Sequence, residues 1–96
     1  MLLLITYDVS TETPEGKKRL SRVAKCCVAH GQRVQNSVFE CILNYGEVLK
    51  LQHKLKAIID PATDSLRFYN LGNNYENKVE HIGIKPSIPL GGTIII

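Results

Sequence analysis

Four stretches of the chain have the apolar pattern of β-strands. Residues 2–7 are apolar at nearly every position, which predicts a strand buried on both faces at the centre of its sheet. Residues 32–36 and 38–43 predict two further strands that form a hairpin or a bent pair. Residues 65–70 alternate apolar and polar side chains and predict a fourth strand.

A first helix is predicted over residues 14–30, between the first and second strands. Thr13 is placed to cap its N-terminus, and Pro14 fits the first helical position. Gly31 follows at the position where helices commonly end on a glycine. The apolar positions that recur at helical spacing, and that we expect to face the core, are Leu20, Val23, Ala24, Cys27 and Val28.

A second helix is predicted between Asn44 and the Asp60-Pro61 pair. Asn44 and Glu47 have the three-residue spacing of a capping box at the start of a helix. At the other end, Pro61 disfavours helical backbone at Asp60. The apolar stripe of this helix consists of Val48, Leu51, Leu55 and Ile58.

The predicted order of elements is β-α-β-β-α-β, which is the order of a ferredoxin-like α+β sandwich. In that fold both helices cover one face of an antiparallel sheet and the other face is bare. A chain of 96 residues buries only a modest core of its own. We therefore expect the bare face to form a homodimer interface or to bind a ligand.

The chain is expected to divide into a ferredoxin-like core, residues 1–72, and a C-terminal arm with an extra strand, residues 73–96. Pro86, Pro89 and the Gly91-Gly92 pair, which precede the last four residues of the arm, favour an extended conformation. Residues 93–96 are all β-forming and would promote aggregation at an exposed sheet edge. We therefore expect the arm to pack on the partner subunit of a dimer.

Composition indicates a globular protein, with 44% hydrophobic and 22% charged residues. No segment has the ~20 apolar residues of a membrane helix, and Asp8 interrupts the apolar N-terminus too early for a secretion signal. We expect a cytoplasmic protein that does not bind membranes. The three cysteines and three histidines lack metal-site spacing, so we expect the cysteines to be small buried side chains. No motif indicates a residue that binds an organic cofactor.

Basic residues concentrate in one part of the chain, although the formal net charge is only +3. Between Glu15 and Glu40 there is no acidic residue. The same interval contains six basic residues: Lys17, Lys18, Arg19, Arg22, Lys25 and Arg33. This pattern suits a polyanionic partner such as nucleic acid, and an ordinary solvated helix face is the alternative.

Asp8 is the first candidate for chemistry because it ends the first predicted strand. Its carboxylate is the type of ligand that Mg²⁺ or Mn²⁺ prefers, and a two-fold axis through the bare face would bring two copies together. The alternative is an ordinary turn residue that leads into Ser10. Arg33 and Gln35 alternate on the second strand and could contact phosphate, whereas Glu40 is interpreted as a surface strand residue.

Four segments together resemble a known family. They are LLITYDVS, the basic helix GKKRLSRVAKCC, the run GQRVQNSVFEC and the fourth strand DSLRFYNLG, which occur in this order between residues 3 and 72. The family is the small CRISPR-associated adaptation protein, the second of the two universal Cas proteins. The third segment, residues 31–41, is its most distinctive motif.

The resemblance implies a ferredoxin-like homodimer with Asp8 as the catalytic and metal-binding residue at the dimer axis. It implies a Mg²⁺-dependent endonuclease, with Mn²⁺ as an alternative, that acts on double-stranded DNA or single-stranded RNA. It further implies a subunit that binds the CRISPR integrase and holds the DNA to be inserted as a spacer. The residues implied to contact phosphate are Lys17, Lys18, Arg19, Arg22 and Arg33.

Two other functions remain compatible with the same residues. The chain could be a non-catalytic subunit that binds DNA and bridges integrase subunits, with nuclease activity dispensable. It could also be a toxin-type RNA interferase, because such enzymes share the fold. Resemblance alone does not separate cutting RNA from holding DNA.

Overall fold

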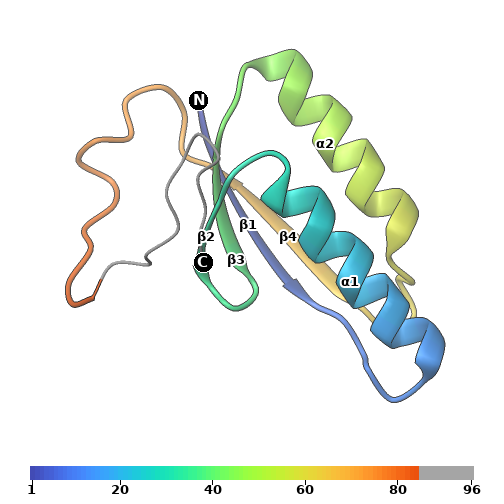
Figure 1. Cartoon of the computed structure of the whole chain (residues 1–96). Coiled ribbons are helices and arrows are strands. Elements are labelled where there is room, and N and C mark those ends of the chain that lie inside the picture. Colours follow the sequence, from blue (N-terminus) through green and yellow to red (C-terminus); the bar gives the residue numbers. More distant parts are fainter. Residues whose placement is uncertain (85–96) are drawn as a thin grey trace.

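The computed structural model describes residues 1–84, and its elements follow the predicted order (Figure 1). The four strands are β1 (Leu2–Asp8), β2 (Gln32–Gln35), β3 (Val38–Ile42) and β4 (Ser65–Asn70). The two helices are α1 (Pro14–Val28) and α2 (Tyr45–Ile58). This β-α-β-β-α-β order confirms the α+β prediction.

The four strands form one antiparallel sheet in the order β2-β3-β1-β4, as in ferredoxin-like folds. The apolar strand β1 lies between β3 and β4, so its predicted central position is confirmed. Leu3 in β1 is paired with Cys41 on one side and with Asn70 on the other. Strand β1 therefore connects β3, in the first half of the chain, with β4, which is the last strand in the sequence.

Both helices lie on the same face of the sheet (Figure 1). Thr13 caps α1 by accepting a hydrogen bond from the Gly16 amide, and Asn44 and Glu47 form the predicted capping box of α2. The core lies between the helices and the sheet. Its fully buried large side chains include Leu3, Ile5, Val23, Phe39, Leu51 and Leu55.

The end of α1 differs from the prediction in length and in the role of Gly31. The helix ends at Val28, and Ala29 serves as its C-cap in right-handed helical backbone. Within residues 1–84 only Gly72 and Gly83 have positive φ, so Gly31 is not a left-handed cap. Gly31 is instead packed against β3, where an added Cβ would overlap Cys41 and lie 2.5 Å from the Glu40 carbonyl oxygen. The need for glycine here is close packing.

The sheet face opposite the helices is only partly open. Asp8, Arg67 and Tyr69 are exposed on the β1–β4 side. On the β2–β3 side, the segment after β4 contributes Tyr75 and Val79 to a hollow of about 420 Å³. We call this opposite face, formed by alternate residues of the four strands, the open face.

The C-terminal arm is described only in part. Residues 73–84 contain turns and bends and no strand, and the exposed side chains near the end of this segment include Ile82 and Ile84. The predicted extra strand, residues 93–96, lies outside the described residues. Its packing on a partner subunit stays a prediction.

Candidate metal and nucleic-acid site

Asp8 is the last residue of β1 and lies on the open face. The odd-numbered side chains of β1, such as Tyr7, pack in the core. Because side chains alternate along a strand, the Asp8 side chain points to the opposite face. Across the ladder Asp8 is paired with Ser65, the first residue of β4. The Asp8 side chain is exposed and makes no hydrogen bond or ion pair with another residue in the range 1–84. Its carboxylate is therefore available to a ligand.

The site also contains Arg67, which sequence reasoning missed. Arg67 is paired with Thr6, which lies two residues before Asp8 in β1 and therefore on the same face of the sheet. Its guanidinium carbon lies 5.2 Å from the centroid of the Tyr69 ring, a cation–π distance. The signal was present in the sequence, because Arg67 and Tyr69 occupy the polar phase of the alternation between Leu66 and Phe68.

The donor chemistry at Asp8 fits Mg²⁺ in part. Mg²⁺ commonly keeps several waters and binds one or two carboxylates together with substrate phosphates. Asp8 is an exposed oxygen ligand of that kind. Within residues 1–84, however, no three metal-ligating side chains come together. Residues 1–84 therefore do not form a complete set of protein ligands, and the remaining ligands of a metal at Asp8 would come from a second copy, a nucleic acid or water.

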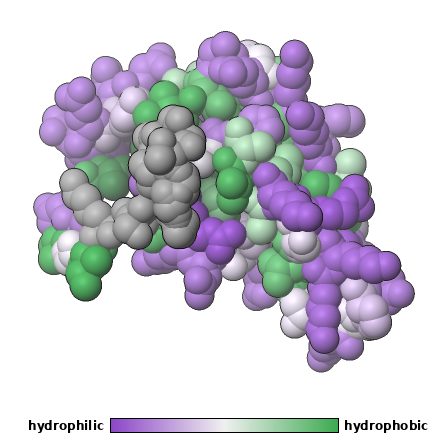
Figure 2. Space-filling model, in the orientation of Figure 1, coloured by the Kyte–Doolittle hydropathy of each residue, from purple (hydrophilic) through white to green (hydrophobic). Residues whose placement is uncertain are grey.

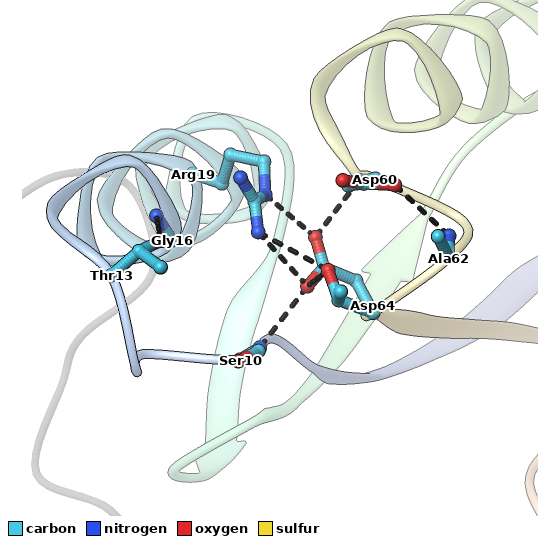
Figure 3. A network of polar contacts seen from close by, with 8 residues as sticks. Ser10, Thr13, Gly16, Arg19, Asp60, Ala62 and Asp64 are labelled. Atoms are coloured by element: carbon cyan, nitrogen blue, oxygen red, sulfur yellow. Dashed lines mark hydrogen bonds and ion pairs between the residues drawn. The ribbon is translucent and has the colours of Figure 1, made fainter.

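A polar network next to the end of β1 connects helix α1, the β1–α1 loop and the loop between α2 and β4 (Figure 3). The Asp64 carboxylate accepts from Arg19 Nε of α1 at 2.8 Å, from the Ser10 amide at 3.1 Å and from the Asp60 amide at 2.9 Å. The Asp64 side chain has no exposed area, and 19% of the Arg19 side chain is exposed. The network fixes the β1–α1 loop against the loop before β4.

The electrostatics of this network favour ionised Asp64. The Arg19 guanidinium, followed by the Asp60 and Ser10 amides, holds the pKa of the Asp64 carboxyl well below its usual range, against the opposing effect of desolvation. The same hydrogen bond raises the pKa of Arg19. Sequence reasoning assigned Arg19 to phosphate, whereas the structure turns its guanidinium toward Asp64.

The remaining basic residues of α1 are exposed on the helix. Lys18, Arg22 and Lys25 are spaced so that they share one side of α1. Lys17 is also exposed, and none of these four forms an ion pair within residues 1–84. Figure 2 shows hydrophilic side chains gathered over the region where α1 begins. Their positive charges are available to a polyanion.

Arg33 lies apart from this helical group, on strand β2. Its guanidinium carbon is 5.0 Å from the centroid of the Phe39 ring, which is itself fully buried. Burial raises the pKa of the nearby Tyr7 hydroxyl, and the charge of Arg33 opposes that rise. Arg33 therefore covers the edge of the core as well as presenting a charge.

The cysteines are structural, as predicted. Burial raises the pKa of Cys27 to about 12 and that of Cys41 to about 11, so neither is a thiolate nucleophile at neutral pH. Cys26 is partly buried and its pKa is also raised. No helix within residues 1–84 has the length and apolar character to cross a membrane.

Comparisons with known proteins agree on one family. The family model described as CRISPR associated protein Cas2 matches residues 1–79. A CRISPR-associated endonuclease Cas2 of Halalkalibacterium halodurans is 58% identical over 95 residues, which cover 99% of this chain and 99% of that protein. A CRISPR-associated endoribonuclease Cas2 of Chlorobaculum tepidum is 54% identical over 96 residues, with 100% of both chains covered. The crystal structure of Streptococcus pyogenes Cas2 matches with a TM-score of 0.74 at 58% identity, covering 86% of this chain and 100% of that one.

Proposed function

Because the chain belongs to the CRISPR-associated protein Cas2 family, we propose that it is a metal-dependent endonuclease of CRISPR adaptation. Its substrate is double-stranded DNA or single-stranded RNA, and its metal is Mg²⁺ or Mn²⁺. The names of the relatives, endonuclease and endoribonuclease, support the nuclease class. The observation that supports the site is the exposed Asp8 carboxylate at the end of the central strand, which has no side-chain partner among residues 1–84.

In this proposal each residue has a defined task. The Asp8 carboxylate holds the metal, and the exposed cations of α1 hold the phosphate backbone. When bound, Mg²⁺ lowers the pKa of water and stabilises negative charge on a phosphate. Lys18 and Arg22 contact phosphates irrespective of base sequence, so they position the backbone without selecting a sequence.

A homodimer completes the site in the same proposal. Two chains that pair through their open faces bring two Asp8 carboxylates toward a common axis, so that the second chain adds its own Asp8 as a ligand. The dimer then binds the CRISPR integrase and spacer-precursor DNA as a subunit of the spacer-integration complex. The mixed character of the open face, with Tyr69 and Ile42 partly exposed, supports burial against another surface.

The deciding experiment compares wild type with Asp8→Asn on matched double-stranded DNA and single-stranded RNA. Each is assayed with Mg²⁺, with Mn²⁺ and with EDTA. We expect cleavage that requires metal, disappears in Asp8→Asn and leaves duplex binding intact. Glu12→Gln is the matched control, because it removes one exposed negative charge four residues later, outside the strand.

A second candidate function is a non-catalytic subunit that binds and bridges DNA. It is favoured by the finding that no three metal-ligating side chains come together within residues 1–84. In the same experiment it predicts duplex binding by both proteins and no cleavage by wild type above the Asp8→Asn background. That result would overturn the nuclease proposal and make Asp8 an interface or turn residue.

A further inference from the structure

The end of β1 has support from only one neighbouring strand at Asp8. Pairing with β3 stops at Thr6 and Val38, with one further hydrogen bond from the Tyr7 amide to the Ser37 carbonyl. Beyond that point Asp8 is paired only with Ser65 of β4. Strand ends with one partner fray readily, so the position of the Asp8 carboxylate depends on how the next residues of the chain are held.

Asp64 acts on both sides of Asp8. It directly precedes Ser65, the pairing partner of Asp8, and its carboxylate also accepts the amide hydrogen of Ser10, two residues after Asp8 (Figure 3). Between these points Val9 is buried in the core. The backbone that leaves Asp8 is thus held by one buried side chain and one charged acceptor.

The opposite side of Ser10 is held by α1. An added Cβ at Gly16 would overlap the Ser10 carbonyl oxygen, so the loop lies directly against the first turn of the helix. Arg19, one turn further along α1, binds Asp64 through both Nε and Nη2, at 2.8 Å and 3.4 Å. Ser10 is therefore enclosed between α1 and the carboxylate that α1 itself binds.

We propose that Arg19 and Asp64 are positioning residues that hold the end of β1, and with it the Asp8 carboxylate, in its functional place. This inference rests on the proposed function of Asp8 as a metal ligand. It assigns the Arg19 guanidinium to Asp64 and leaves phosphate contact to the more exposed neighbours of Arg19, such as Arg22. Outer residues that orient a ligand commonly affect metal affinity or activity by about 10- to 100-fold.

An asparagine cannot replace Asp64 in this network. The two carboxylate oxygens accept from Arg19, from the amides of Ser10 and Asp60, and from the Thr63 hydroxyl at 3.1 Å. In Asp64→Asn one oxygen becomes an NH₂ group, which would face hydrogen-bond donors. The variant keeps the volume of the side chain and removes its ability to hold both loops.

The test uses the full chain and the variants Asp64→Asn, Arg19→Gln and the double variant. Hydrogen exchange of backbone amides, measured by NMR without metal, reports on the loop. We expect the Ser10 amide to exchange at least about tenfold faster in each variant. The amides of Leu3 and Ile5, in the middle of β1, should keep their protection and so show that the variants are folded.

Two further readouts connect the loop to the site. Broadening of the Asp8 amide signal by Mn²⁺ reports metal binding directly, and the variants should need about 10 to 100 times more Mn²⁺ for half the effect. Metal-dependent cleavage should fall by a similar factor. The double variant should lose no more than the worse single variant, because both changes break one unit.

Arg22→Gln is the matched control, since it removes one cation from the same helix without contacting Asp64. It should weaken the salt dependence of duplex binding and leave Ser10 exchange unchanged. Arg19→Gln should instead leave the salt dependence unchanged and make the Ser10 amide exchange faster. The proposal is overturned if Arg19→Gln behaves like Arg22→Gln, or if Ser10 exchange is normal in Asp64→Asn. If Mn²⁺ does not broaden Asp8 in wild type, the metal function fails, while Ser10 exchange still decides whether the network holds the strand end.

Discussion

Gly31 is the position at which the absence of a side chain matters most for packing. Its backbone lies against Cys41 and Glu40 of β3. The atoms nearest to an added Cβ are Cys41 Sγ, which is buried, and the Glu40 carbonyl oxygen, which belongs to the backbone, so neither moves aside easily. We expect Gly31→Ala to lower the free energy of unfolding by about 1–3 kcal/mol, as overpacking does in other interiors. Urea denaturation measures the change.

Gly46→Ala provides the control for this prediction. Gly46 lies in the first turn of α2, and the atom nearest to an added Cβ is Asn44 Oδ1 at 3.5 Å, which is ordinary contact. Alanine is a better helix former than glycine by about 1 kcal/mol. The Gly46→Ala protein should be as stable as wild type or more so, and equal losses at both glycines would contradict the packing argument.

Asp64 should make stability depend on acid. Its pKa is lower in the folded chain than the ordinary value of 3.8, so the folded state binds this proton more weakly than the unfolded state. The contribution is complete well above pH 3.8 and is lost as the pH falls below that value. The difference in urea midpoint between wild type and Asp64→Asn should therefore be larger at about pH 7 than at about pH 3. A difference of the same size at both pH values would contradict this role.

At the scale of elements, helix α1 has an apolar side that packs in the core and a basic side that faces solvent. One side is buried through Val23 and Cys27, and another presents Lys18 and Arg22 to solvent. We expect Lys18→Gln with Arg22→Gln to reduce the slope of log K against log salt for duplex binding by about 1.8. Binding isotherms at several salt concentrations measure that slope.

The control for the α1 prediction lies on α2. Lys50 and Lys54 are also exposed and four residues apart, so replacing both by glutamine removes the same charge with the same spacing. The slope should stay at the wild-type value in this variant. If both pairs lower it equally, the binding depends on net charge and not on the basic side of α1.

The elements themselves were predictable because their signals are local. The alternation in β4 and the capping box at Asn44 each depend on residues within one strand or one turn, and both agree with the structure. The end of α1 was misjudged because Gly31 was interpreted as the glycine that ends the helix, when its role is to fit against β3. That role depends on a contact with a different element, which local pattern does not show.

The position of the candidate site in the fold was predictable to the same limit. Asp8 could be selected because a carboxylate that ends a buried strand is recognisable in the sequence. Asp64 could not, since its partner Arg19 is 45 positions away and both residues have ordinary surface composition around them. Only the fold brings the loop before β4 to the start of α1.

At the scale of the whole molecule, the open face should determine self-association. Tyr69 is 38% exposed there, on the strand that pairs with Asp8. We expect Tyr69→Asp to shift a homodimer to monomers, because it places a charge in the surface proposed to be buried. Sedimentation at several protein concentrations measures the change.

Tyr45→Asp is the matched control for that prediction. Tyr45 is 64% exposed and begins α2, which lies on the other side of the sheet. Its replacement should leave the association state as in wild type. Monomers from Tyr45→Asp, with Tyr69→Asp still dimeric, would place the interface on the helical face.

The strand order also governs when the sheet can form during synthesis. β1 leaves the ribosome first among the strands, yet one of its two neighbours is β4, the last strand. Leu3 of β1 therefore cannot pair with Asn70 until β4 has been synthesised. At about 5–20 residues per second, translation from Asp8 to its partner Ser65 takes roughly 3–11 s. During that interval the most apolar strand has an unsatisfied edge that other nascent chains or chaperones can contact. The end of β1 that carries Asp8 is thus one of the last parts of the fold to be assembled in the cell.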